Sequence, residues 1–224
     1  LIEIHKINTN KIELNPGGVD LDRFKPSIEK TSIREELDIP EEKIILLTVR
    51  NLVHRMGLEN LIKALELVVK NTPDIFLVIG GDGPLKNKLI TLTNRLGLGD
   101  YVRFSGFIPD DDLPDYYRMS DLFVLPTKEL EGFGLVTLES MATGLPVVGT
   151  PVGGTKEILN KFDSAFLFKD TTPEAMAEII LKYHRIIKYS PQEWKETSVK
   201  CRKYVEDNYS WAKNVDELEK LLIE

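Results

Sequence analysis

Short apolar runs alternate with helical patterns along most of this chain, and this alternation constrains the fold more than any other feature. The apolar runs lie at 12–14, 44–49, 75–79, 101–104, 122–125 and 147–149. The run at 44–49 does not alternate between polar and apolar residues, which is typical of a strand buried on both faces. Strands that alternate with helices favour a parallel sheet. The sequence therefore predicts an α/β fold with a Rossmann-like parallel sheet and helices on both faces.

The helical patterns carry recognisable start and stop signals. We predict helices at 32–37, 58–69, 84–96 and 110–118, and another that begins near 135. Ser32, followed three residues later by Glu35, predicts a capping box at a helix start. Pro84 suits a first helical position, and Gly97 suits the residue after a helix end.

The character of the sequence changes after residue 170. Three further helices are predicted at 173–188, 191–205 and 211–222. We therefore divide the chain into a Rossmann-like domain at 1–170 and C-terminal helices at 171–224 that pack on it.

Composition limits the class of protein. The chain has 224 residues, 42% of them hydrophobic, and a formal net charge of −7, which argues against a general nucleic-acid surface. There is no run of the length that spans a membrane and no N-terminal targeting signal, so we expect a cytoplasmic protein. Cys201 is the single cysteine and has no metal-spaced partners. We expect no metal site: Asp110, Asp111 and Asp112 are adjacent, so their side chains diverge, and we interpret them as a helix start.

Ligands of open parallel sheets bind at the carboxyl ends of the strands. In this chain those ends are followed by loops at 50–57, 80–84, 105–110, 126–134 and 150–155. We expect these five loops to converge on one site.

The stretch 131–139 carries the strongest chemical signal. Gly132 and Gly134 precede a predicted helix, so backbone N–H groups there can approach an anion closely. Glu131 comes before the glycines, and Glu139 lies on a helix face with Leu135, Leu138 and Ala142, which we expect to be buried. An anion site between two carboxylates suits a ligand with phosphates in the middle and hydroxyls at both ends, as in a nucleotide-sugar. An ordinary βα unit with no ligand is the alternative.

These motifs resemble the family 4 (group 1) glycosyltransferases, retaining enzymes with the two-domain GT-B fold. Glu131 and Glu139, with Phe133, Gly134 and Leu135 between them, resemble the family's Glu-seven residues-Glu motif. Four further segments resemble family motifs in the same order, so the match covers about residues 11–170: NPGGVD at 15–20, GGDGPL at 80–85, FSGFI at 104–108 and TPVGG at 150–154.

The resemblance implies that this chain is the donor-binding C-terminal half, with domain 1–170 binding a nucleoside-diphosphate sugar. An N-terminal acceptor-binding domain of the same parent protein would be its partner, and the acceptor would be a glycan or a lipid-linked molecule. No cofactor or metal is implied. By itself the chain should show no turnover, and contact with the inner face of a membrane would come only through the missing part. The last helix, with Trp211, Val215, Leu218 and Leu222, either packs on this domain or waits for the N-terminal one.

The resemblance also assigns roles to site residues. Glu139 should accept hydrogen bonds from the ribose, and Glu131 should hold a hydroxyl of the donor sugar. The backbone of Phe133, Gly134 and Leu135 should meet the distal phosphate. The remaining expected contacts are with the base or the cleft wall and come from Phe107, Ile108, Gly17, Gly18 and Gly81. A buried salt bridge or cap for Glu139, and a solvated loop acid for Glu131, are the structural alternatives.

The basic residues depart from the family pattern. The family has Gly-Arg after its strand and Lys-Gly five residues after that Arg, but the aligned positions here are Asn51 and Met56. Arg50 and Arg55 lie one place earlier at the same spacing. Arg55 is our first candidate for the cationic phosphate contact, because Arg can bind a diphosphate in bidentate fashion, and Arg50 is the second. A surface ion pair is the alternative for Arg50.

Other functions also fit a chain of this kind. A GT-B-like epimerase or phosphorylase would lack the paired glutamates around Gly-Phe-Gly. A non-catalytic nucleotide-sugar-binding or interaction module would tolerate the changes at Asn51 and Met56.

Overall fold

The computed structural model describes residues 8, 12, 17–27 and 29–223. Apart from Ile12, the strand predicted at 12–14 lies outside the described residues. In the described part, five parallel strands form one sheet in the order β3-β2-β1-β4-β5. The strands are β1 (Ile44–Val49), β2 (Ile75–Gly80), β3 (Val102–Gly106), β4 (Leu122–Leu125) and β5 (Val147–Gly149). The predicted α/β class and parallel sheet are confirmed.

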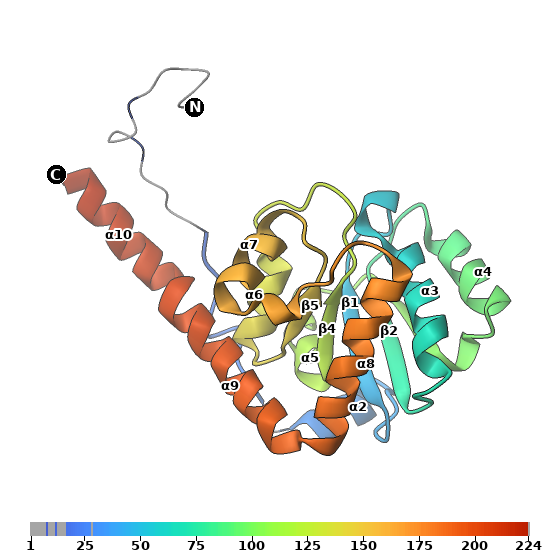
Figure 1. Cartoon of the computed structure of the whole chain (residues 1–224). Helices are drawn as coiled ribbons and strands as arrows, with labels where there is room; N and C mark the ends of the chain where they lie inside the picture. The colour runs from blue at the N-terminus through green and yellow to red at the C-terminus, as the bar shows by residue number, and fades with distance from the viewer. Residues whose placement is uncertain (1–7, 9–11, 13–16, 28, 224) are drawn as a thin grey trace.

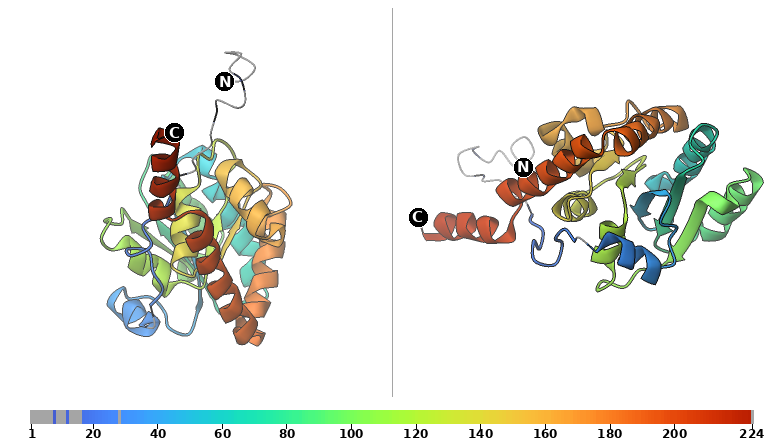
Figure 2. Two further views of the ribbon diagram at one scale, coloured as in Figure 1. Left: turned by 90° about the vertical axis from the view of Figure 1, so that its left-hand side faces the viewer. Right: turned by 90° about the horizontal axis from the view of Figure 1, so that it is seen from below.

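Helices cover both faces of this sheet (Figures 1 and 2). Those before β5 are α2 (Lys30–Glu36), α3 (Leu58–Val69), α4 (Lys86–Arg95), α5 (Leu113–Met119) and α6 (Leu135–Ala142). Those after it are α7 (Gly153–Phe162), α8 (Pro173–Tyr189), α9 (Pro191–Asn208) and α10 (Trp211–Ile223). Helices α3 and α8 pack together on one face, and α2 and α5 pack together on the other. Short 3-10 turns occupy His54–Met56, Gly99–Tyr101 and Ser164–Phe166.

The central strands have the burial that their composition predicts. Ile45, Leu46 and Leu47 of β1 are almost completely buried, and Leu58, Leu61 and Leu65 of α3 are completely buried. Strands packed between two helical layers have no solvent-facing side, which explains the continuous apolar run at 44–49.

Several predicted helix starts were wrong. Ser32 lies inside α2, where its hydroxyl donates to the carbonyl of Glu29, so it does not cap the helix. Pro84 lies in the turn before α4, which begins at Lys86. The helix predicted from residue 110 begins at Leu113, after the three aspartates. Helix α7 was not predicted, because it begins at two glycines, Gly153 and Gly154, that sequence reasoning assigns to a loop.

Helix α10 extends away from the body of the domain (Figures 1 and 2). Its start is held by a bridge between Val19 and Ser210 and by the Val19 N–H, which donates to the Tyr209 carbonyl (2.9 Å). Beyond that point, Trp211, Val215, Leu218 and Leu222 are between 45% and 77% exposed. Trp211 reaches Gly18 at the start of the helix, whereas the described part of the chain leaves Val215, Leu218 and Leu222 largely uncovered.

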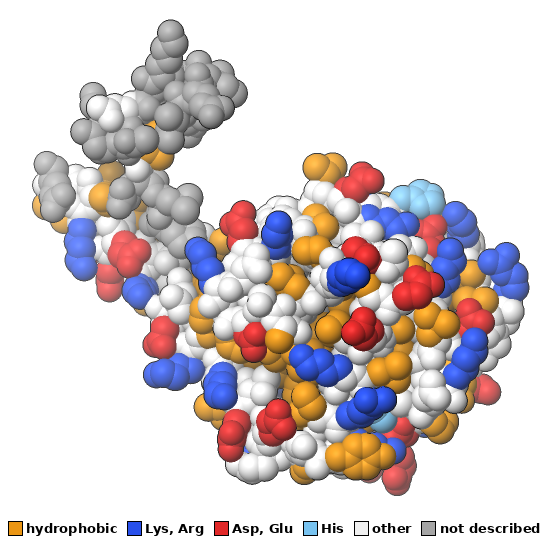
Figure 3. All heavy atoms as spheres, in the orientation of Figure 1, with side chains coloured by type: hydrophobic (Ala, Val, Ile, Leu, Met, Phe, Trp, Pro, Cys, Tyr) orange, Lys and Arg blue, Asp and Glu red, His pale blue; other side chains and the backbone are white. Residues whose placement is uncertain are grey.

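The face seen in Figure 3 carries acidic and basic side chains interspersed, with no large area of a single charge. Among the described residues, no helix is both long enough and apolar enough to cross a lipid bilayer.

Candidate functional site

The loops at the carboxyl end of the sheet converge, as predicted. The Leu52 N–H donates to the Asp82 carbonyl (2.9 Å), and the Gly81 N–H donates to the Gly106 carbonyl (2.6 Å). On the other side of β1, the Lys128 N–H donates to the Arg55 carbonyl (2.8 Å). The loop after β1 leads toward β2 on one side of the sheet, and the loop after β4 leads toward β5 on the other side. These two loops therefore border the switch-point crevice, where open sheets bind ligands.

Arg50 and Glu131 meet inside this crevice. The guanidinium Nη2 of Arg50 donates to the Glu131 carboxylate and to the hydroxyl of Thr127 (2.5 Å), and that hydroxyl donates in turn to Glu131 (2.9 Å). The side chains of Arg50 and Glu131 are only 5% and 10% exposed. The Nε of Arg50 is buried and has no hydrogen-bond partner in the described part of the chain. The ion-pair alternative for Arg50 is therefore what the structure shows, but the pair is buried at the site rather than on the surface.

Glu139 lies on α6 and faces α5. Its Oε2 accepts a hydrogen bond from the hydroxyl of Tyr117 (2.9 Å), and the Tyr117 ring is completely buried. Burial raises the pKa of Glu139, and the hydrogen bond from Tyr117 and the nearby charge of Arg23 offset only part of that rise. Glu139 makes no salt bridge with any described residue, so the salt-bridge alternative does not hold.

The glycine-rich stretch caps α6 as its sequence suggests. Gly134 adopts the left-handed conformation (φ 86°) at the N-cap, and α6 begins at Leu135. The N–H groups of Thr137 and Leu138 already donate to the Gly134 carbonyl (2.9 and 3.3 Å), so the N–H groups of Leu135 and Val136 precede the helical hydrogen bonds. One expectation was wrong: Leu135 is 50% exposed, because this first turn faces a groove and not the core.

That groove has a volume of about 690 Å³ and lies beside the start of α6. Gly17, Phe133, Leu135 and Gly154 line it, together with Tyr209 and Trp211 from the junction of α9 and α10. Gly153 and Gly154 allow α7 to approach the loop closely, since a Cβ on either would lie 2.0–2.2 Å from the carbonyl oxygens of Glu131 and Phe133. These two glycines therefore have a structural role.

The two candidate cations lie in different environments. Arg55 is half-buried, and its Nη1 donates to the Leu130 carbonyl (2.8 Å), which ties the loop after β1 to the loop after β4. Of the two departures from the family pattern, Met56 is buried and Asn51 is exposed at the start of the loop.

The remaining predicted contacts divide into open and packed positions. The ring of Phe107 is 75% exposed, whereas Ile108 is buried against Gly80. Gly81 lies against the carbonyl of Arg50, and a Cβ there would be 1.9 Å from that oxygen. Gly17 lies under the Phe133 ring, while Gly18 is buried against the backbone of Trp211. Of these five positions, Phe107 presents the most open side chain.

Sequence reasoning missed three site residues. The hydroxyl of Tyr117 donates a hydrogen bond to Glu139, and that of Thr127 donates one to Glu131. The third residue is Arg23, whose Nη2 donates to the Asp110 carbonyl and whose charge lowers the pKa of Glu139. Tyr117 lies between Tyr116 and Arg118 in a segment of mixed polarity, and nothing in the sequence distinguishes it from an ordinary helix aromatic until its hydroxyl is located. Thr127 follows a buried strand, which is a weak positional signal.

The acidic run at 110–112 precedes α5, and the described residues contain no group of three or more His, Cys, Asp or Glu side chains arranged to hold a metal ion.

Comparison with known proteins agrees with this architecture. The family model of the glycosyl transferases group 1 matches residues 29–200. A GDP-mannose-dependent alpha-(1-6)-phosphatidylinositol monomannoside mannosyltransferase of Mycolicibacterium smegmatis is 30% identical over 218 residues, which cover 94% of this chain and 56% of that protein. The chain spans about half the length of the curated relatives it matches.

Solved structures show the same fold. A glycosyltransferase from Rickettsia africae superposes with a TM-score of 0.85 at 24% identity, over 98% of this chain and 59% of that one. The C-terminal domain of a glycosyl transferase group 1 family protein from Francisella tularensis superposes with a TM-score of 0.74 at 25% identity, over 87% of this chain and 100% of that domain. This chain therefore belongs to the glycosyl transferases group 1 family and has the fold of the C-terminal half of a GT-B glycosyltransferase.

Proposed function

We propose that this chain binds a nucleoside-diphosphate sugar in the switch-point crevice and is the donor-binding half of a retaining glycosyltransferase. The observation that carries the proposal is the position of two largely buried carboxylates, Glu131 and Glu139, on either side of the start of α6. The free N–H groups at a helix start bind a diphosphate well. Carboxylates on either side of it can accept hydrogen bonds from the hydroxyl groups of the ribose and the sugar.

In this proposal, the site has a hydrogen-bonding group for each part of such a ligand. Glu139 accepts hydrogen bonds from the ribose, and Glu131 accepts one from a sugar hydroxyl. The N–H groups of Leu135 and Val136 receive the distal phosphate, with the backbone of Phe133 and Gly134 alongside it. The base lies toward Phe107 and Ile108. Gly17, Gly18 and Gly81 give the cleft its backbone wall.

The charge on the leaving diphosphate requires cations. Arg55 is half-buried at the edge of the crevice, and its guanidinium has donors beyond the one bonded to Leu130. The Nε of Arg50 has no hydrogen-bond partner among the described residues, but its Nη2 is committed to Glu131 and Thr127. Arg55 is therefore the phosphate contact in this proposal, and Arg50 holds Glu131 in place.

The proposed reaction retains the anomeric configuration. The bond from the sugar C1 to the diphosphate oxygen breaks, a bond from C1 to the acceptor hydroxyl oxygen forms on the same face, and the hydroxyl proton passes to the leaving diphosphate. Fixed N–H groups and arginine side chains stabilise the leaving charge without a metal ion. The acceptor binds to an N-terminal domain of the parent protein, so this chain alone binds the donor without transferring the sugar.

A non-catalytic nucleotide-sugar-binding module is the second candidate. Met56 favours it, because an apolar, buried side chain stands where the family pattern has a lysine. Donor binding by the parent protein with no sugar transfer to any acceptor would support the module, and turnover would exclude it.

Calorimetric titration of this chain with GDP-mannose, UDP-glucose and ADP-glucose tests the donor site. GDP-mannose comes first because the Mycolicibacterium relative is described as dependent on it. We expect one base to be preferred and Glu139→Ala to weaken its binding about 10- to 100-fold, as for loss of a charged acceptor. Glu193→Ala, which removes an exposed carboxylate from α9, is the matched control and should bind as the unmodified chain does. Failure of all three donors to bind would overturn the proposal.

A further inference from the structure

Tyr117 is held in place from two sides. Its ring is completely buried in α5 and packs edge-on against Phe24 (centroids 5.9 Å apart) and Phe123 of β4 (5.2 Å). Both neighbours are themselves buried, so the ring has one position and its hydroxyl has one direction. That hydroxyl donates to Oε2 of Glu139 (2.9 Å).

The hydroxyl of Tyr117 can serve only as a donor to this carboxylate. Burial, with the Glu139 charge beside it, raises the pKa of Tyr117 well above its ordinary value, so the phenol stays protonated. Within the described part of the chain, Tyr117 is the one hydrogen-bond donor to Glu139. The second oxygen, Oε1, and the remaining lone pair of Oε2 are left for a ligand.

We propose that Tyr117 is a positioning residue of the donor site, whose hydroxyl fixes the Glu139 carboxylate in the orientation that accepts both ribose hydroxyls of the nucleotide. This inference rests on the proposed function, because it assigns the ligand of Glu139 to the ribose. A glutamate has three rotatable bonds, and fixing them before binding lowers the entropy lost when the ligand arrives.

The electrostatic surroundings of Glu139 give the hydroxyl a second effect. Besides burial, three groups act on the pKa of this carboxylate: Tyr117 of α5 through its hydrogen bond, and Arg23 before α2 and Asp110 after β3 through their charges. Burial and Asp110 raise the pKa of Glu139, whereas Tyr117 and Arg23 lower it. Removing the hydroxyl should therefore raise this pKa further, and binding should begin to fail at a higher pH as the solution is acidified.

Tyr117→Phe is the direct test, since it keeps the ring and both aromatic contacts. The probes are GDP, UDP and ADP, each paired with its 2′,3′-dideoxy form, titrated into the chain by calorimetry. We expect Tyr117→Phe to weaken binding of the preferred ribonucleotide about tenfold and to leave the dideoxy form unchanged. In a Glu139→Ala background the same change should have no further effect.

Tyr183→Phe is the matched control. Tyr183 is also buried, and its hydroxyl donates to the Ala165 carbonyl (3.0 Å) in a different part of the chain. Its loss should cost similar stability and leave both ribonucleotide and dideoxynucleotide binding unchanged.

The outcomes separate this inference from the function on which it rests. If the unmodified chain binds none of the three nucleotides, the proposed function fails and the inference falls with it. In another outcome, the unmodified chain prefers the ribonucleotide over its dideoxy form while Tyr117→Phe binds the ribonucleotide as tightly as the unmodified chain does. In that case the proposed function stands and the proposed role of Tyr117 is wrong. Equal weakening of both forms by Tyr117→Phe would also overturn the role, because it would show a general structural defect.

Discussion

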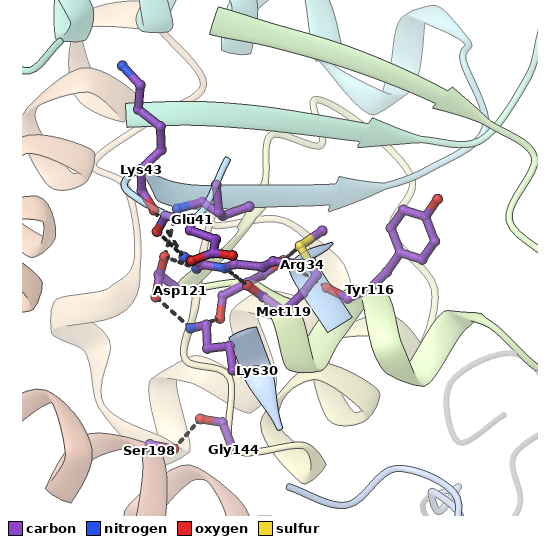
Figure 4. Close-up of polar contacts among 11 residues, drawn as sticks. Lys30, Arg34, Glu41, Lys43, Tyr116, Met119, Asp121, Gly144 and Ser198 are labelled. Carbon is purple, nitrogen blue, oxygen red and sulfur yellow. Dashed lines mark hydrogen bonds and ion pairs between the residues drawn. The ribbon is translucent and has the colours of Figure 1, made fainter. Parts of the chain in front are cut away.

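The two ends of the sheet use buried charges in opposite ways. At the amino end, Asp121 accepts hydrogen bonds from Lys30 (2.5 Å), Arg34 (2.7 Å) and the Ile45 N–H (2.7 Å), and Figure 4 shows these side chains pointing toward one another. The other donors of Arg34 reach backbone carbonyls of Met119, Glu41 and Lys43. At the carboxyl end, the Arg50–Glu131 pair leaves Arg50 Nε unpartnered among the described residues, and Glu139 has a single donor.

This difference separates stabilisation from ligand capacity. A buried charge with all its hydrogen bonds made inside the protein has nothing left for a ligand, and it stabilises the contact that it bridges. A buried carboxylate with free lone pairs costs folding free energy until a ligand provides donors. The carboxyl end also contains the left-handed residue Leu130 (φ 55°), whose conformation is unfavourable for a side chain with a Cβ, whereas Gly153 (φ 51°) adopts the same region without that cost.

Asp121→Ala should have the largest effect on stability. It leaves Arg34 buried without its anion and removes the acceptor of the Ile45 N–H, so we expect the free energy of unfolding to fall by about 3–5 kcal/mol. Urea denaturation followed by circular dichroism measures it. Burial alone would raise the pKa of Asp121, but Lys30 and Arg34 hold it below its ordinary value. The stabilisation is therefore present above the ordinary aspartate pKa and disappears as the pH falls through the lowered value. A loss below 1 kcal/mol would break the contrast between the two ends.

Gly153→Ala should cause the next largest loss in the free energy of unfolding. The Cβ would lie 2.0 Å from the carbonyl oxygen of Glu131 at a residue with φ 51°, so strain and overlap add to about 2–4 kcal/mol. Gly97→Ala is the matched control, because Gly97 also has a positive φ (69°) but a Cβ there would meet nothing within 4 Å. The control should lose only about 1 kcal/mol in the same denaturation experiment. Equal losses for Gly153→Ala and Gly97→Ala would show that the loop at 131–134 shifts to accommodate the added Cβ at little cost in free energy.

The sequence predicts the frame of the site better than its internal contacts. Strands β1, β4 and β5 and helix α3 have their predicted bounds, because their apolar or periodic runs are continuous and end at polar, proline or glycine residues. The start of α6 at Leu135 follows from the glycines before it. The pairing of Arg50 with Glu131, 81 residues apart, depends on the loops after β1 and β4 meeting, and no local pattern encodes which cation turns toward which acid. Tyr117 was missed because its contact with Glu139 likewise depends on how two separate helices pack.

Lys30→Met should have a small effect at the amino end. The Lys30 side chain is 36% exposed, and its Nζ shares Asp121 with Arg34 and the Ile45 N–H, which would remain. We expect a loss of about 0.5–1 kcal/mol, as for a peripheral ion pair. Measured beside Asp121→Ala, it separates the contribution of the outer cation from that of the inner one, and a loss as large as that of Asp121→Ala would place Lys30 at the centre of the network.

Glu139→Gln should change the stability by a similarly small amount but with the opposite sign. Because burial raises the pKa of Glu139 above its unfolded-state value, keeping the carboxylate ionised costs stability at pH values above that raised pKa. The amide removes this cost and can still accept from Tyr117, so we expect a gain of about 0.5–1 kcal/mol at pH 7. The gain should vanish below the ordinary glutamate pKa, where the acid is neutral in both states. Thermal unfolding at several pH values measures it, and calorimetry should show weaker donor binding by the same variant. A stability loss at pH 7 would mean that the carboxylate is already satisfied, like Asp121 at the other end of the sheet.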